Sequence, residues 1–395
     1  MRAALRVALA LAAFAPSLVF AANAASPAIA RPAYAGAYEP QGVDERGLWQ
    51  EMDDFERGFR DAPLVVRNPE LKDFVRKVLC RTVGDDRCGA ARIYIVQDDS
   101  FNASMAPNGL MQVHTGLLAR LHSEAELAAV LGHEFAHFEQ RHSLELFKKQ
   151  RKAGDFVAWM SLASAVSGVS SYAAQSGIIA GVYAFNRAQE AEADSLSGGF
   201  LKGSPYRIRA SNVWQRLIEE QDALRTERGL RKLNKKAPNL LDTHPTDKQR
   251  FLYFSQLELE AGDRGEDGLK GYKTATDPFV PILFAGLIKG NDFAAADYVI
   301  RSRGDALGWD APLLYARGEL YRLRGNPRDL MTAAELYRKA SVMPDAPAET
   351  WRGLGLAEIR AGDSAAGRSA LAEYLKRAPS GPDAKMIQTL MGTVQ

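Results

Sequence analysis

The stretch AAVLGHEFAHFEQRH, residues 128–142, contains the pattern H-E-x-x-H inside an apolar run with the period of an α-helix. Residues four apart lie on one face of a helix, so His133 and His137 can direct their imidazoles to a single point. Two neutral imidazole nitrogens at one point suit a zinc ion. Glu134 lies beside that point, where a carboxylate can accept a proton from a zinc-activated water. The stretch therefore predicts a metal-binding helix that carries its own general base.

A second helical stretch, NRAQEAEAD at residues 186–194, supplies further acidic groups. A catalytic zinc site needs three protein ligands and one open position, and Glu190 is the predicted third ligand. Asp194 lies one helical turn later on the same face, where it can accept the free N–H of a ligand histidine and fix its orientation. Glu192 is expected to face away from the metal and to meet solvent.

At these residues the chain resembles the gluzincin family of zinc metalloproteases, which includes the membrane peptidase HtpX, the CAAX prenyl endopeptidases and the periplasmic protease BepA. In that family a helix with H-E-x-x-H is followed by a helix with E-x-x-A-D. The matching residues here are His133, Glu134, His137, Glu190 and Asp194. The resemblance extends over about residues 45–260 and implies one Zn²⁺ per chain and protein or peptide substrates. The C-terminal repeats described below make the BepA-like periplasmic proteases the most similar branch.

The segment Thr243-His244-Pro245 follows the metal helices, where the resembled family brings a loop to the zinc. Three roles for His244 stay open. It can cap the open zinc position as a latch, donate a hydrogen bond to the substrate oxyanion, or serve only as a loop residue before a helix. Arg250 is expected to hold this loop or to stabilise charge on the substrate oxygen.

The charge balance bears on the possible binding partners, and the first residues bear on the cellular compartment. Lys and Arg total 50 against 48 acidic residues, so the chain has no large positive net charge that would attract nucleic acid. Residues 1–24 combine a basic start, an apolar run and small residues, which predicts a secretory signal peptide and a periplasmic location. The alternative is an uncleaved anchor helix. Residues 25–44 are rich in Ala, Pro and Gly and are expected to form a flexible leader.

Cys80 and Cys88 are the only cysteines of the chain. An exported compartment is oxidising, so this even pair is a candidate disulfide joining the end of an early helix to the following strand. Two free buried thiols are the alternative.

Two strands, at residues 92–96 and 109–114, are expected to form a small sheet beside the metal helix, and its edge is a candidate cradle for an extended peptide. His114, on the second strand, is expected to contact the sheet or the substrate. His122 and His142 are expected on the surface. Residues 156–186 contain no charged residue and predict either a soluble lid of two short helices, which can touch a membrane surface, or a membrane hairpin.

The C-terminal third contains a repeat. Residues 263–277 are Gly-rich and charged and predict a linker. Beyond them Gly290, Gly325 and Gly362 recur at intervals of 35 and 37 residues between helical runs, which is the period of tetratricopeptide units. Such arrays form surfaces that bind partner segments.

These observations predict a mainly α protein: a zincin-like catalytic domain with a small β-sheet beside the active-site helix, followed by an α-helical tetratricopeptide array. The predicted parts are a signal peptide (1–24), a leader (25–44), a metallopeptidase domain (45–262), a linker (263–277) and a repeat domain (278–395). The resemblance implies an exported zinc endopeptidase that cuts unfolded or misassembled envelope proteins, with the array recruiting substrates or the outer-membrane assembly machinery. The alternative is a non-catalytic periplasmic scaffold or chaperone with a structural zinc site.

Overall fold

A computed structural model of the chain describes residues 40–152, 187–232 and 247–393. The predicted signal peptide, the hairpin at 156–186 and His244 lie outside the described residues. The elements up to residue 152 are α1 (Gly42–Phe59), β1 (Val65–Val66), α2 (Pro69–Val83), α3 (Asp85–Cys88), β2 (Arg92–Val96), β3 (Ala103–Met105), β4 (Leu110–His114), α4 (Thr115–Arg120), α5 (Glu124–Glu139) and α6 (His142–Lys152).

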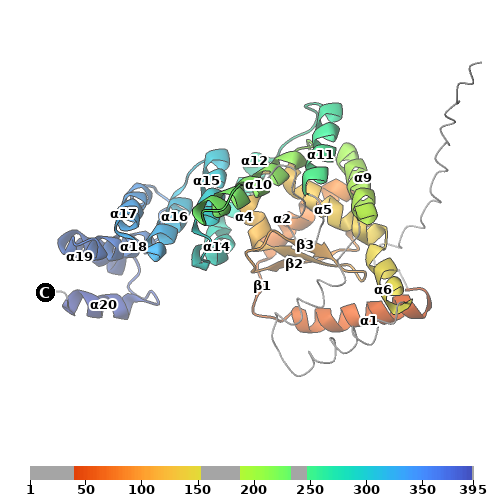
Figure 1. Cartoon of the computed structure of the whole chain (residues 1–395). Coiled ribbons are helices and arrows are strands. Elements are labelled where there is room, and N and C mark those ends of the chain that lie inside the picture. Colours follow the sequence, from red (N-terminus) through yellow and green to blue (C-terminus); the bar gives the residue numbers. More distant parts are fainter. Residues whose placement is uncertain (1–39, 153–186, 233–246, 394–395) are drawn as a thin grey trace, which may run out of the picture. The chain divides into compact units, whose positions relative to one another are not determined.

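The four strands form one mixed sheet with the order β1-β2-β4-β3. Figure 1 shows this sheet beneath α2 and α5. β2 and β4 are parallel, with Ile93 opposite Met111, whereas β1 and β3 pair antiparallel with their neighbours. Successive side chains of a strand point to opposite faces. Ile93 and Ile95 accordingly belong to the main core with α2 and α5, whereas Val96 packs with α1 on the other face. Both faces of the sheet are therefore covered.

The helix that carries H-E-x-x-H, α5, is buried along its whole length. Ser123 caps it by accepting a hydrogen bond from the backbone N–H of Glu126 at 3.1 Å. Leu127, Leu131 and Phe135 bury their side chains completely. A helix without a solvated face must be enclosed by other elements, and α2, β3, α9 and α10 all contact α5. Its position is consequently fixed from several sides.

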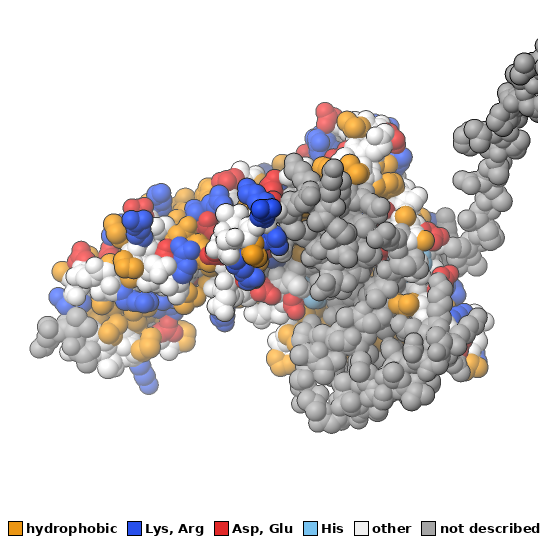
Figure 2. Space-filling view, viewed as in Figure 1, with side chains coloured by type: hydrophobic (Ala, Val, Ile, Leu, Met, Phe, Trp, Pro, Cys, Tyr) orange, Lys and Arg blue, Asp and Glu red, His pale blue; other side chains and the backbone are white. Residues whose placement is uncertain are grey.

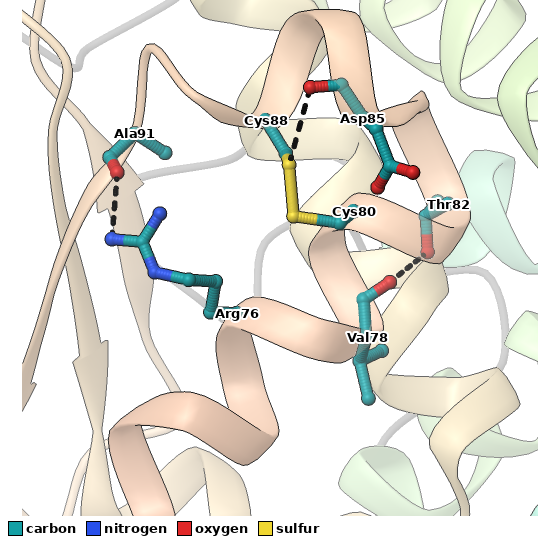
Figure 3. The surroundings of a disulfide bond; sticks show 7 residues. All are labelled: Arg76, Val78, Cys80, Thr82, Asp85, Cys88 and Ala91. Atoms are coloured by element: carbon teal, nitrogen blue, oxygen red, sulfur yellow. Dashed lines mark hydrogen bonds between the residues drawn. A yellow bond between two sulfur atoms is a disulfide. The ribbon is translucent and has the colours of Figure 1, made fainter. Parts of the chain in front are cut away.

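A disulfide joins Cys80 at the end of α2 to Cys88 of α3, with Cα atoms 4.9 Å apart (Figure 3). The Cys88 Sγ also lies 3.8 Å from the Asp85 carbonyl oxygen. In the same view Arg76 of α2 donates a hydrogen bond to the carbonyl of Ala91, the residue before β2. The short loop from α2 into β2 is thus held at both ends.

The remaining elements are helical. They are α9 (Arg187–Gly203), α10 (Ala210–Glu227), α11 (Asp247–Ala261), α12 (Leu269–Thr276), the 3₁₀ turn η2 (Asp277–Phe279), α13 (Val280–Leu283), α14 (Ala285–Lys289), α15 (Phe293–Leu307), α16 (Ala311–Arg324), α17 (Pro327–Ser341), α18 (Glu349–Arg360), α19 (Ser364–Arg377) and α20 (Ala384–Thr393). Helices α16 with α17 and α18 with α19 pack as successive pairs. The predicted fold class is confirmed: a mainly α chain with a small sheet and a helical C-terminal region that fits a repeat array.

Acidic and basic side chains are interspersed over the visible face of these C-terminal helices (Figure 2). Within the described ranges, no helix combines the length and the apolar character needed to cross a membrane.

Residues in the predicted linker pack against the metal-binding part of the chain. Tyr272 of α12 is fully buried, and its hydroxyl donates a hydrogen bond to the Leu118 carbonyl at 2.7 Å. A Cβ atom at Gly271 would lie 2.0 Å from a carboxylate oxygen of Glu124, the first residue of α5, so a larger residue would displace that side chain. Further along, Phe284 and Ile300 belong to the same core as α5. The core of the metal-binding region therefore continues into α12 to α16.

This shared core predicts where the chain can be shortened. A chain that ends at residue 277 loses a set of buried side chains that includes Phe279, Val280, Phe284 and Ile300. At about 1.5–3 kcal/mol for each large apolar side chain, the loss is comparable to the whole stability of a domain. A chain that ends at residue 345 keeps them all. We expect cooperative thermal unfolding and zinc binding from the second chain and neither from the first. A cooperatively folded, zinc-binding chain ending at residue 277 would instead support the predicted domain boundary.

His122 yields a prediction about pH. Its expected surface position is wrong, because the side chain is only 7% exposed and its Nε2 lies 3.5 Å from the Ser302 hydroxyl. Burial, reinforced by the positive charges of Arg216 and Arg303, lowers the pKa of His122 to about 2. The unfolded chain binds this proton near pH 6.5 and the folded chain does not, so the contribution to stability is lost as the pH falls below 6.5.

Between pH 7 and pH 5 we expect the unfolding free energy of the wild type to fall by about 2 kcal/mol more than that of His122→Asn. Urea titrations of metal-free protein at both pH values measure the difference. Equal losses in the two proteins would show that His122 does not cause the acid sensitivity.

Candidate metal centre

Three donor atoms from two helices converge in the core. His133 and His137 of α5 place their Nε2 atoms 3.1 Å apart. Glu190, in the first turn of α9, places one carboxylate oxygen 3.5 Å from the Nε2 of His133 and the other 3.5 Å from the Nε2 of His137. All three side chains are buried. The structure therefore brings together the three residues that the sequence analysis selected as ligands.

The close packing of α5 on α9 makes this convergence possible. A Cβ atom at Gly132 would lie 3.2 Å from the Ser197 hydroxyl and 3.3 Å from a methyl carbon of Thr82. Ser197 also donates a hydrogen bond to the Ala129 carbonyl at 3.4 Å. Small residues on the facing surfaces thus let the two helices approach until Glu190 reaches the histidines.

The spacing of the donors fits a small tetrahedral ion. Zinc binds imidazole nitrogen and carboxylate oxygen at about 2.0–2.2 Å, which separates two ligands of a tetrahedron by about 3.3–3.6 Å. The observed separations of 3.1 and 3.5 Å match this edge length. The donor set, two imidazoles and one carboxylate, is one that catalytic zinc sites use. The residues present therefore fit zinc.

Charge balance supports the same conclusion. Glu134, Glu190 and Asp194 are each at most 5% exposed, and the cationic group that opposes them among the described residues is Arg250, 4% exposed. With both histidines neutral, as metal ligands must be, these three carboxylates and Arg250 together carry a net charge of −2. Buried charge is costly unless it is neutralised, so a divalent cation is the expected partner.

Asp194 lies behind His133 and links it to Arg250. Its Oδ1 is 2.9 Å from the Nδ1 of His133 and 3.0 Å from an Nη2 of Arg250. Burial raises the pKa of Asp194, but Arg250 and His133 lower it to below its ordinary value. The ionised carboxylate faces the Nδ1 of His133 at 2.9 Å, which favours a hydrogen on Nδ1 and leaves the Nε2 lone pair of that ring for the metal.

Among the described residues, Arg250 donates its hydrogen bonds to Asp194 and not to the donor atoms of the three candidate ligands. Besides its three hydrogen bonds to Asp194, its guanidinium lies over the Trp214 ring, 4.2 Å from the centroid. Arg250 was expected to hold the loop that contains His244, and this loop lies outside the described residues. The latch and oxyanion roles of His244 therefore stay predictions. Within the described part Arg250 acts through Asp194, as the countercharge of the buried cluster.

A proton must leave this site when a metal enters it. Burial and the charge of Arg250 lower the pKa of His133, but Asp194 and Glu190 raise it by more, to about 9. A ligand histidine must be neutral, so metal binding displaces this proton.

His142 is the residue that sequence reasoning missed. It was expected on the surface, which is wrong: the side chain is 2% exposed, and its Nδ1 lies 2.8 Å from the Nδ1 of His137. In a continuous helix, a residue five positions later would lie about 140° around the axis from His137. The helix instead ends, and Arg141 adopts a left-handed φ of 56° at a cost of about 1–2 kcal/mol. No helical periodicity signals such a turn.

Two further expectations concern Glu192 and His114. Glu192 is half-exposed, as expected of a residue facing solvent, but its carboxylate also lies 3.4 Å from the Nε2 of His142. His114, at the end of β4, places its Nδ1 2.8 Å from the Ser100 hydroxyl and 3.3 Å from Asp98. The structure therefore places His114 on β4 against the loop that follows β2, and not among the three metal donors.

The role of Asp194 can be tested directly. Asp194→Asn keeps an acceptor for His133 but removes the charge that raises its basicity, so we expect zinc affinity to fall by about 10- to 100-fold. Competition with a chelator measures it, and far-UV circular dichroism checks that the variant folds. Lys202→Gln, an exposed change on the same helix, is the control. An unchanged affinity would show that Asp194 does not support the ligand.

Comparison with known proteins places this site in a family. Residues 66–257 match the model of Peptidase family M48. A putative beta-barrel assembly-enhancing protease of Vibrio cholerae is 26% identical over 212 residues, which cover 50% of this chain and 41% of that protein. The beta-barrel assembly-enhancing protease of Yersinia pestis is 26% identical over 217 residues, covering 51% of this chain and 42% of that protein.

The human mitochondrial metalloendopeptidase OMA1 is 30% identical over 207 residues, which cover 47% of this chain and 37% of that protein. The chain thus spans about two fifths of the length of these curated relatives. The matched residues contain the whole donor cluster on α5 and α9. The resemblance seen in the sequence is confirmed: residues 66–257 match peptidase family M48, and the bacterial relatives are named beta-barrel assembly-enhancing proteases.

Proposed function

We propose that this protein is a zinc-dependent endopeptidase with one Zn²⁺ per chain, held by His133, His137 and Glu190. The observation that carries the proposal is the convergence of three buried side chains: the two Nε2 atoms are 3.1 Å apart, and each lies 3.5 Å from a different oxygen of the Glu190 carboxylate. This spacing suits ligands around one small ion. The match of residues 66–257 to peptidase family M48 supports the same activity.

The chain's own residues divide the chemistry between them. When bound, zinc supplies a Lewis acid that polarises a peptide carbonyl and acidifies water. Glu134 follows His133 on α5, is buried, and is not needed as a ligand. Its carboxylate takes a proton from the attacking water and delivers it to the amide nitrogen that leaves. Asp194 and Arg250 hold His133 and balance the charge.

The sheet offers a way to hold substrate. β3 is the last strand in the order β1-β2-β4-β3 and contacts α5. A terminal strand can accept an extended peptide as an added strand, because main-chain hydrogen bonds do not depend on sequence. Only a segment free of its own structure can pair in this way. The proposed substrates are therefore unfolded or misassembled proteins.

The names of the bacterial relatives, beta-barrel assembly-enhancing proteases, support a more specific role in the cell envelope. In this proposal residues 1–24 direct the chain to the periplasm, and the C-terminal helices recruit substrates or the outer-membrane assembly machinery. Residues 156–186 would add a peripheral membrane contact.

Glu134→Gln tests the activity. The change keeps the size of the side chain but removes the base, so we expect zinc content to stay at one per chain and the cleavage rate to fall by about 10²- to 10⁴-fold. Digestion of casein or unfolded porin, with metal analysis of the same samples, measures both. His133→Ala is the matched control and should lose both zinc and activity.

Equal zinc loss in Glu134→Gln and His133→Ala would make Glu134 a ligand and contradict the proposal. A wild-type protein that binds zinc, prevents aggregation of unfolded porin and cleaves nothing would support the alternative, a periplasmic scaffold or chaperone with a structural zinc site.

A further inference from the structure

The turn between α5 and α6 brings a third histidine to the metal centre. Arg141 has the left-handed conformation noted above, and its guanidinium donates a hydrogen bond to Glu45 of α1 at 3.2 Å. Its backbone N–H donates to the Phe138 carbonyl at 3.0 Å. These contacts direct the first residue of α6, His142, back to His137. A strained backbone that is held in place by its surroundings is typical of functional sites.

The two rings are close enough to share a hydrogen, and a metal on Nε2 of His137 would determine which ring carries it. The Nδ1 atoms of His137 and His142 are 2.8 Å apart, so one of them carries the hydrogen and the other accepts it. A neutral imidazole has a single N–H, and the Nε2 of His137 must present its lone pair to the metal. The hydrogen of His137 is therefore on Nδ1, and His142 is the acceptor. The N–H of His142 is then on Nε2, facing a carboxylate oxygen of Glu192 at 3.4 Å.

The Nδ1 atoms of the two histidines of the donor cluster thus face different groups. The Nδ1 of His133 faces Asp194, a charged carboxylate paired with Arg250, at 2.9 Å. His137 donates to a neutral ring, whose own N–H faces a half-exposed carboxylate. The groups behind His137 extend to the protein surface at Glu192, whereas Asp194 and Arg250 behind His133 are both buried.

We propose that His142 is a positioning residue of the metal centre, which fixes the tautomer and the orientation of His137 by accepting its Nδ1–H. The proposal rests on the zinc site of the proposed function. Without this acceptor, the proton of His137 can move to Nε2, where it competes with the metal for the lone pair. Loss of the acceptor therefore weakens metal binding without removing a ligand.

The test compares variants of the full chain that differ in the acceptor. His142→Asn keeps an oxygen close to the position of Nδ1, whereas His142→Phe and His142→Leu fill the space without an acceptor. Zinc affinity is measured by chelator competition, the absorption spectrum of the Co²⁺-loaded protein reports the ligand geometry, and urea unfolding of metal-free protein reports stability. We expect the apolar variants to lose about 10- to 100-fold in zinc affinity and the Asn variant less than about 10-fold, with a Co²⁺ spectrum like that of the wild type.

The remaining outcomes overturn the inference. Equal zinc affinity in all four proteins would show that His137 needs no acceptor. Zinc affinities that fall equally in the Asn and apolar variants, together with equal losses of metal-free stability, or failure of both apolar variants to fold, would assign His142 a purely structural role. A wild-type chain that binds no zinc would overturn the proposed function itself and the inference with it, an outcome that the wild-type titration separates from the others.

Discussion

The buried negative charge around α5 and α9 is the constraint on which the rest of the structure depends. Three carboxylates are enclosed in the core with one opposing guanidinium, that of Arg250. Such a cluster is tolerated only where neighbouring groups are held in register and a cation completes the balance. The fully buried metal helix, the small residues between α5 and α9, and the docking of α11 through Arg250 all serve to keep these groups at fixed distances.

The ligands could be selected from the sequence because each lies on a regular helix. The four-residue spacings of His133 with His137 and of Glu190 with Asp194 translate directly into shared faces. The strand at residues 92–96 could likewise be placed, since its apolar residues lie between clear turn signals. The sequence pattern was sufficient to predict these residues because each lies in a regular helix or strand.

Other features depend on tertiary contacts that have no local pattern. His142 reaches His137 only because Arg141 leaves the helical conformation, and the sequence contains no glycine there to announce it. His122 is buried by α15, which comes about 180 residues later in the chain. Residues 263–277 have the composition of a linker, yet Tyr272 and Gly271 fit against α4 and α5. Polar and glycine-rich composition predicts exposure on average, and close packing overrides it at particular positions.

The stacking of Trp214 on Arg250 has a practical consequence. Indole emission responds to charge near the ring, and this indole lies 4.2 Å from the guanidinium that balances the metal cluster. The ring also meets Phe101, in the loop between β2 and β3, edge-on at 6.1 Å. Trp214 therefore stands between the charge of the metal centre and the loop that leads to the outer strand. Its fluorescence, isolated from that of the other four tryptophans by difference against Trp214→Phe, makes the protein its own optical reporter of metal occupancy.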